Sequence, residues 1–138
     1  MRQPSDWDKS IIEEFRANAG KVGGRFEGAS MVLLTTTGAK TGEAGITPLV
    51  CLPDGDRVLV FASKGGAPKN PGWYHNLVAN PTATVEVGSE KYAATATVIT
   101  GDERDRLYAK QVERFPGFGD YEKNTTRVIP VVALIRKA

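Results

Sequence analysis

One segment of the sequence combines the chemical groups that bind anions. It reads Ser-Lys-Gly-Gly-Ala-Pro-Lys-Asn-Pro from residue 63 to residue 71. Ser63, Lys64 and Lys69 supply hydrogen-bond donors and positive charge, and the two glycines let backbone N–H groups approach a ligand closely. No acidic residue lies among them. The composition indicates an anion-binding loop, while an exposed turn kept soluble by its lysines accounts for it equally well.

A second candidate loop is rich in hydroxyl groups. Residues 35 to 42 read Thr-Thr-Thr-Gly-Ala-Lys-Thr-Gly, so Lys40, Thr41 and the glycines could hold a phosphate or carboxylate group. The spacing differs from that of a Walker A motif, and the residues that follow are typical of a strand rather than a helix. Hydrolysis of nucleoside triphosphates is therefore not supported. A threonine-rich strand end explains the same residues.

A short helix predicted after the first loop carries an aromatic ring and an amide. Trp73 and Asn76 are three residues apart and share one helix face, where both could meet a planar heterocycle. A tryptophan in such a position is also a common core residue. His75 is expected to point away from this pair, and without an evident carboxylate partner it is typical of a surface residue. Cys51 lies in an apolar run with no base nearby, which predicts a buried, unreactive thiol.

Three aromatic residues surround a predicted helix break at Pro116-Gly117. Phe115, Phe118 and Tyr121 could line an apolar substrate mouth or plug the end of a barrel. Together with the two loops, they make the chain rich in ligand-binding groups and poor in groups that transfer protons. That balance is typical of a protein whose bound cofactor does the chemistry while the polypeptide supplies position and electrostatics.

The elements that must position these residues are predicted from runs of apolar and β-branched residues and from capping signals. The predicted strands are residues 31–37, 46–52, 57–62, 82–87, 91–100 and 128–136. The predicted helices are residues 6–19, capped by Ser5; a short helix between Asn70, its cap, and Asn80-Pro81; and a helix from Thr100, its cap, to about Phe115. Strands and helices do not alternate regularly, which favours an antiparallel sheet closed into a small barrel. Pro130 predicts an edge or a bulge in the last strand.

Composition excludes several classes of function. The chain has 138 residues with 18 basic and 16 acidic side chains, one histidine and one cysteine, as expected for one soluble globular domain. A net charge of +2 argues against nucleic acid as a partner, and a lone histidine leaves no multi-histidine metal site. The unpaired cysteine predicts a cytoplasmic protein, and no integral membrane segment is expected. A peripheral position at the inner membrane face and a homodimer both stay open.

The order and spacing of several motifs resemble the deazaflavin-dependent nitroreductase and quinone reductase family of actinobacteria. The resemblance covers about residues 30 to 136 and rests on these segments: residues 35–42, 47–49 and 62–71, Trp73-Tyr74, Asn76-Leu77, residues 79–81, Asp120-Tyr121 and residues 127–132. It implies a flavin-reductase-like fold, a six-stranded antiparallel split β-barrel with helices (α+β). It also implies hydride transfer from reduced coenzyme F-420, an 8-hydroxy-5-deazaflavin, to a quinone, a nitroaromatic or another electron-poor small molecule.

The resemblance further implies roles for individual residues. Lys40, Thr41 and Gly42 would meet the phosphate and polyglutamate tail of the cofactor. Ser63 and Tyr121 would orient the acceptor or relay the proton that follows hydride transfer. The residues that would border the ring system and complete its groove are Pro48, Leu49, Ala62, Ser63, Lys64, Gly65, Gly66, Trp73 and Asn76.

Departures from the family's pattern concern both the cofactor and the acceptor. Ala39 and Gly45 stand where the family usually has arginines, and the second of these typically binds the phosphate. Val50, Phe115 and Phe118 stand where some relatives have tyrosines, which predicts a more apolar substrate mouth. Two alternatives stay open: a non-catalytic carrier of a deazaflavin, flavin or tetrapyrrole, and an oxidase of the same architecture that uses FMN, the less favoured cofactor.

Overall fold

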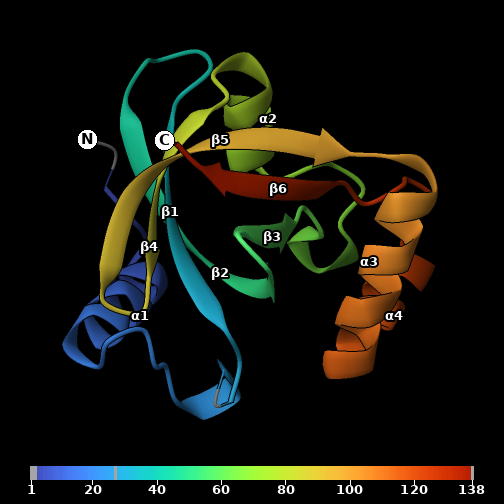
Figure 1. Ribbon diagram of the computed structural model, residues 1–138, viewed down its shortest axis with the longest axis horizontal. Coiled ribbons are helices and arrows are strands. Elements are labelled where there is room, and N and C mark those ends of the chain that lie inside the picture. The colour runs from blue at the N-terminus through green and yellow to red at the C-terminus, as the bar shows by residue number, and fades with distance from the viewer. Residues whose placement is uncertain (1–2, 27, 138) are drawn as a thin grey trace.

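Six antiparallel strands close into a barrel in the computed structural model, which describes residues 3–26 and 28–137 (Figure 1). The strands are β1 (Met31–Thr37), β2 (Ala44–Asp54), β3 (Arg57–Phe61), β4 (Thr82–Val87), β5 (Glu90–Ile99) and β6 (Val131–Arg136). Their order around the barrel is β1-β2-β3-β6-β5-β4, and β4 pairs with β1 to close it. The predicted fold class is confirmed.

Alternate side chains of the strands fill the inside of the barrel, as the two-residue period of a strand requires. Val32 and Leu34 of β1 point inward and are fully buried together with Val85 and Leu134. Leu33 points outward from β1 and is also fully buried, because a helix covers it. Burial on both faces explains why β1 begins with an unbroken apolar run.

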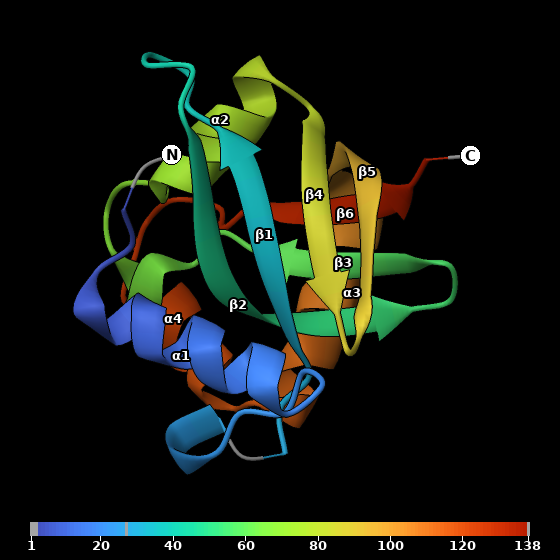
Figure 2. The same ribbon diagram turned by 90° about the vertical axis from the view of Figure 1, so that its left-hand side faces the viewer.

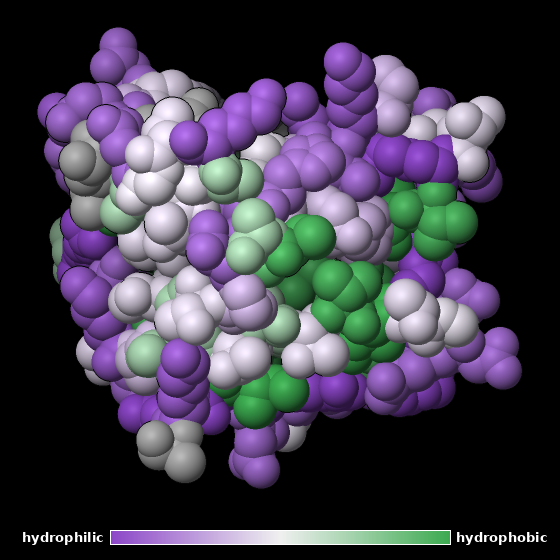
Figure 3. Space-filling view, turned by 90° about the horizontal axis from the view of Figure 1, so that it is seen from above, coloured by the Kyte–Doolittle hydropathy of each residue, from purple (hydrophilic) through white to green (hydrophobic). Residues whose placement is uncertain are grey.

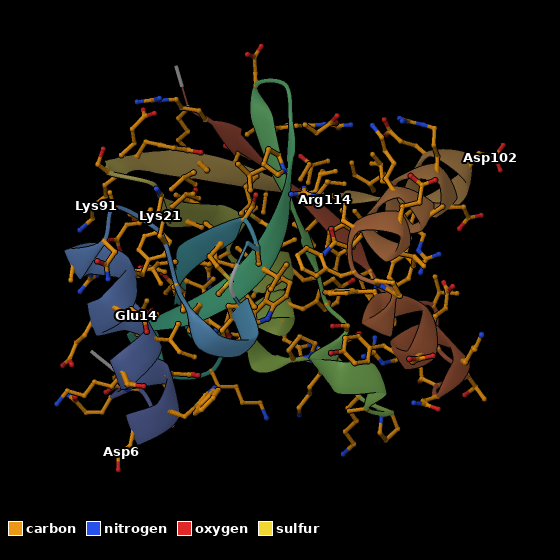
Figure 4. The ribbon with its side chains drawn as sticks, turned by 90° about the horizontal axis from the view of Figure 1, so that it is seen from below. Asp6, Glu14, Lys21, Lys91, Asp102 and Arg114 are labelled. Carbon is orange, nitrogen blue, oxygen red and sulfur yellow. The ribbon has the colours of Figure 1, made fainter. Side chains whose placement is uncertain are left out.

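Four α-helices surround the barrel: α1 (Asp6–Ala17), α2 (Gly72–Ala79), α3 (Gly101–Arg114) and α4 (Gly117–Lys123). Two 3-10 turns, η1 (Gly24–Phe26) and η2 (Lys64–Gly66), complete the list. Helices α1 and α3 cover opposite sides of the barrel, and Asp6 and Asp102 mark the outer ends of these two helices when the molecule is seen from below (Figure 4). The barrel therefore has a packed layer on each of these sides.

The apolar face of α1 packs on the barrel. Ile11, Ile12 and Phe15 are buried against the side chains of Met31 and Leu33. This packing buries the apolar face of α1, which is the face that a membrane surface would bind. Across residues 3–26 and 28–137, no helix has the length and apolar character needed to cross a membrane.

Several element boundaries differ from the prediction. Helix α1 ends at Ala17, two residues early, and β2 is longer at both ends. The last strand begins only at Val131 and lies between β3 and β5, so the prediction of an edge or a bulge at Pro130 is wrong. Pro130 precedes the strand, and its carbonyl accepts a hydrogen bond from the Ala62 N–H (3.0 Å). The break at Pro116-Gly117 leads directly into α4, which was not predicted.

Only one of the three predicted helix caps is confirmed. The Asp8 N–H donates to the Ser5 side chain (3.1 Å) at the start of α1. Pro71 rather than Asn70 occupies the capping position of α2, and the Thr100 side chain makes no capping hydrogen bond to α3. The Asn70 side chain is bonded elsewhere, to an arginine more than fifty residues away in the chain.

Candidate functional site

A cleft of about 760 Å³ lies between the β1–β2 loop, α2 and the N-terminal segment. The tip of the β1–β2 hairpin stands beside α2, with the N-terminal segment next to both (Figure 2). Four of the predicted cofactor-binding residues line this cleft: Lys40, Thr41, Trp73 and Asn76. The structure therefore brings the β1–β2 loop, which carries Lys40, next to helix α2, which follows the Ser63 loop.

The β1–β2 loop is a tight turn that places Lys40 at the cleft wall. The Gly38 N–H donates to the Glu43 carbonyl (2.8 Å), and the Gly42 N–H donates to the Gly38 carbonyl (3.0 Å). Gly42 adopts a φ of 72°, a conformation that favours glycine. The Thr41 side chain accepts a hydrogen bond from the Glu43 N–H (3.2 Å), which closes the turn. Gly42 itself shapes the loop and is not in the cleft lining.

Asn76 fixes this loop against α2. Its Oδ1 accepts a hydrogen bond from the Ala39 N–H (3.0 Å), and its Nδ2 donates to Oγ1 of the buried Thr36 (3.0 Å). The amide thus bridges the end of β1 and the loop that carries Lys40. Trp73 on the same helix is 6% exposed and packs in the barrel core while it also lines the cleft.

The charge of the cleft is mixed. Lys40 is the one lysine or arginine in the cleft lining over the part of the chain that the structure describes, and Asp8 and Glu43 contribute carboxylates. Burial raises the pKa of Asp8 above its usual range. Ala39 and Gly45, the positions that lack the family's arginines, both line the cleft. His75 also lines the cleft, and it is exposed, as predicted for a surface residue.

A second group of predicted residues lies at the junction of η2 and α4: Ser63, Lys64, Gly65, Gly66 and Tyr121. Ser63 is buried and precedes η2, where Lys64 is exposed with a φ of 47°. Gly66 lies so close to α4 that an added Cβ would be 2.8 Å from the Tyr121 carbonyl oxygen. The turn and Tyr121 are therefore in direct contact. None of these residues belongs to the lining of the cleft, and residues 67–71 and α2 connect the two groups.

Three other predicted residues, Pro48, Leu49 and Ala62, belong to neither group. Pro48 and Leu49 are half-buried on β2, where they pair with Leu33 and Val32 of β1. Ala62 is fully buried at the end of β3. Cys51 is buried as predicted, and burial raises the pKa of its thiol to about 12. The thiol is therefore neutral at physiological pH, which excludes it as a nucleophile.

The aromatic residues near the helix break pack on the outside of the barrel. Phe118 makes edge-to-face contacts with Phe61 (5.8 Å between ring centroids) and Tyr121 (5.1 Å). The Tyr108 hydroxyl donates to the Phe118 carbonyl (2.7 Å), and burial raises the pKa of Tyr108 to about 12. These contacts anchor α4 to α3 and β3. The aromatic set therefore supports the position of Tyr121 and does not plug the barrel.

One residue with a clear part in this region was not identified as a site residue. The Arg127 guanidinium donates to the Ser63 carbonyl (2.7 Å), the Ala67 carbonyl (2.9 Å) and Asn70 Oδ1 (2.7 Å). It lies in the 127–132 motif, but nothing in the local sequence predicts these partners because they are at least 57 residues away.

The closed antiparallel barrel with a ligand-sized cleft at one rim defines a protein of the split β-barrel class. The model of the family described as F420H(2)-dependent quinone reductase matches residues 7–136, and the chain belongs to this family. The predicted family is confirmed, and coenzyme F-420 is the cofactor that its description names.

Relatives and solved structures agree with this assignment. An F420H(2)-dependent quinone reductase of Mycobacterium tuberculosis is 40% identical over 127 residues, which cover 89% of this chain and 85% of the relative. A structure of an F420-H2 dependent reductase, FDR-A, is 40% identical with a TM-score of 0.70 and covers 76% of this chain and 93% of its own. A second structure, described as a domain-swapped dimer, is 35% identical with a TM-score of 0.72 and covers 96% and 99%.

The bridge made by Asn76 generates a prediction about stability. Asn76→Ala removes two hydrogen bonds and leaves the buried Thr36 hydroxyl without this partner, so the free energy of unfolding should fall by about 1–2 kcal/mol. Asn80→Ala is the matched control, since Asn80 is exposed on the chain just after the same helix. Chemical denaturation of both variants measures the effect, and equal stabilities would contradict the bridging role.

Proposed function

We propose that this protein is an oxidoreductase that passes a hydride from reduced coenzyme F-420 to a quinone or another electron-poor acceptor, including nitroaromatic compounds. The observation that carries the proposal is the cleft. It combines the loop that carries Lys40 with Trp73 in a chain that matches the quinone reductase family from residue 7 to residue 136.

The residues present fit the cofactor. Coenzyme F-420 has a planar ring system and a tail with phosphate and carboxylate groups, so its site needs a flat apolar wall and a cation. Trp73 supplies the wall, and Lys40 with the Thr41 hydroxyl supplies the anion-binding end. The cleft volume of about 760 Å³ lies in the range of sites for ligands of this size. Asp8 and Glu43 would repel the tail, which restricts its anionic groups to the region of Lys40.

The reduced cofactor, when bound, supplies a hydride from C5 of its ring. The protein then has to hold the acceptor, exclude water and place a proton, and it needs no nucleophile of its own. Ser63 would donate a hydrogen bond to the acceptor oxygen, and Lys64 would stabilise negative charge that develops there. The Tyr121 hydroxyl would hold the proton that completes reduction. Pro48, Leu49, Gly65 and Gly66 would border the ring, whereas the fully buried Ala62 has no surface to offer it.

A carrier that binds a deazaflavin without turnover is the second candidate. The absence of arginine at Ala39 and Gly45 favours it, because a single lysine is a weaker phosphate ligand than a bidentate arginine. An FMN-dependent oxidase is a third candidate with no specific observation in its favour. The three differ in which cofactor binds and whether it is then oxidised.

Cofactor titration distinguishes these functions. Reduced coenzyme F-420 should bind to the wild-type protein and lose its hydride on addition of menadione or an aromatic nitro compound under anaerobic conditions. Lys40→Ala should raise the dissociation constant roughly 10- to 100-fold, since one charge-assisted hydrogen bond is worth roughly 1.5–3 kcal/mol. Lys110→Ala, which removes an exposed lysine from α3, is the matched control. Binding without oxidation would indicate the carrier, and tight binding of FMN alone would indicate the oxidase.

The role of Ser63 leads to a separate prediction. Ser63→Ala should lower kcat by about 10²-fold, the usual cost of losing a donor to developing negative charge, while the cofactor dissociation constant changes little. Ser89→Ala in the exposed turn between β4 and β5 should leave both constants unchanged. Steady-state kinetics and a binding titration on each variant make the comparison. An equal loss of turnover and of affinity would assign Ser63 to cofactor binding alone.

We also propose a cytoplasmic homodimer. The related structure described as a domain-swapped dimer supports self-association. An apolar patch lies on the face seen from above (Figure 3). Val78 on α2 and Val98 on β5 are among the exposed large apolar side chains. Light scattering after gel filtration should give twice the mass of the 14.9 kDa chain. A Val98→Lys variant should shift the protein to the monomer mass, and a wild-type monomer would refute the dimer.

A further inference from the structure

Arg127 is bonded to three separate points of a single loop. Its Nη2 donates to the carbonyl at the start of the loop (Ser63, 2.7 Å), its Nε donates to a carbonyl in the middle (Ala67, 2.9 Å), and its Nη1 donates to the side chain at the end (Asn70, 2.7 Å). Within the described residues, Arg127 makes every side-chain hydrogen bond to residues 63–70. All three guanidinium nitrogens are therefore committed to this loop.

The loop that Arg127 holds contains a strained residue. Lys64 has a φ of 47°, which costs a residue with a side chain roughly 1–2 kcal/mol compared with the right-handed region. Such a conformation persists only when surrounding contacts impose it. On its other side the turn is pressed against α4, where a Cβ at Gly66 would come within 2.8 Å of the Tyr121 carbonyl oxygen. The turn is thus clamped between α4 and Arg127.

We propose that Arg127 is a positioning residue that keeps residues 63–70 in the strained arrangement needed to present Ser63 and Lys64 to cofactor and acceptor. This inference rests on the proposed function. Its physical basis is that a planar guanidinium can bond three acceptors in fixed directions, whereas a lysine ammonium at the same position cannot reach all three. Removing the clamp would let Lys64 return to an unstrained conformation and move its side chain away.

The first arm of the test measures cofactor affinity in Arg127→Lys and Arg127→Ala. Both variants should raise the dissociation constant for coenzyme F-420 at least tenfold, because loss of preorganised geometry weakens binding even when charge is kept. Arg106→Ala is the control, since Arg106 is exposed on α3 and its ion pair with Glu103 is long, at 3.8 Å. Millimolar guanidinium ion should restore affinity to Arg127→Ala, and ammonium ion should not.

The second arm needs no cofactor. Amide hydrogen exchange of residues 63–70 should accelerate at least tenfold in both Arg127 variants, while exchange in β4 stays at the wild-type rate. Replacing Lys64 with glycine removes the strain, so loss of Arg127 no longer relieves any. The fall in melting temperature caused by Arg127→Ala should therefore be larger in a Lys64→Gly background than in the wild-type background. An arginine that stabilises the fold without imposing strain on Lys64 would give the same fall in melting temperature in both backgrounds.

The outcomes separate this inference from the proposed function. Failure of the wild-type protein to bind coenzyme F-420 overturns the proposed function, and hydrogen exchange then still decides whether Arg127 clamps the loop. Wild-type affinity in Arg127→Lys overturns the positioning role, because charge alone would then suffice. Unchanged exchange in residues 63–70 overturns it as well. If Arg127→Ala fails to fold, Arg127→Lys carries the same comparisons.

Discussion

Pairing between β1 and β4 closes the barrel, and the position of every candidate residue depends on that closure. The register joins Leu33, Leu34 and Thr35 to Glu86, Val85 and Thr84, so β1 is bonded on both sides. A strand held on both edges cannot shift without losing two ladders and the core side chains that alternate along it. The loop after β1 is therefore anchored where it meets α2, and the cleft exists because these two elements cannot move apart.

Local patterns predict most of this architecture and fail where a distant partner decides. The strand at residues 31–37 and the strand at residues 82–87 have the predicted limits, because their apolar residues repeat over a short range. The cap expected from Asn70 fails because its side chain accepts a hydrogen bond from Arg127 instead. Arg127 is 57 residues away along the chain, so no local pattern contains this contact.

The candidate site shows the same division. Residue types predict that the Lys40 loop and the Ser63 loop bind a ligand, and a helix-face argument joins Trp73 to Asn76. The sequence does not reveal that Asn76 uses its amide on Thr36 and Ala39, or that the two loops form separate groups joined by α2. These arrangements arise from contacts across 37 to 64 residues of chain. The geometry of the candidate site therefore depends on distant partners that no local pattern contains.

Rigidity has a particular value in a cleft with so little positive charge. Lys40 is a point charge on a flexible stem, and it loses rotamer entropy when it binds an anion. Asn76 lowers the separate cost of ordering the backbone that carries Lys40, just as Arg127 fixes the backbone that carries Lys64. Preorganisation of this kind adds affinity without adding charge. A chain that lacks arginine at positions 39 and 45 thus depends on two half-buried polar side chains, Asn76 and Arg127. Their loss would lower its affinity for an anionic ligand more than it would lower that of a relative with both arginines.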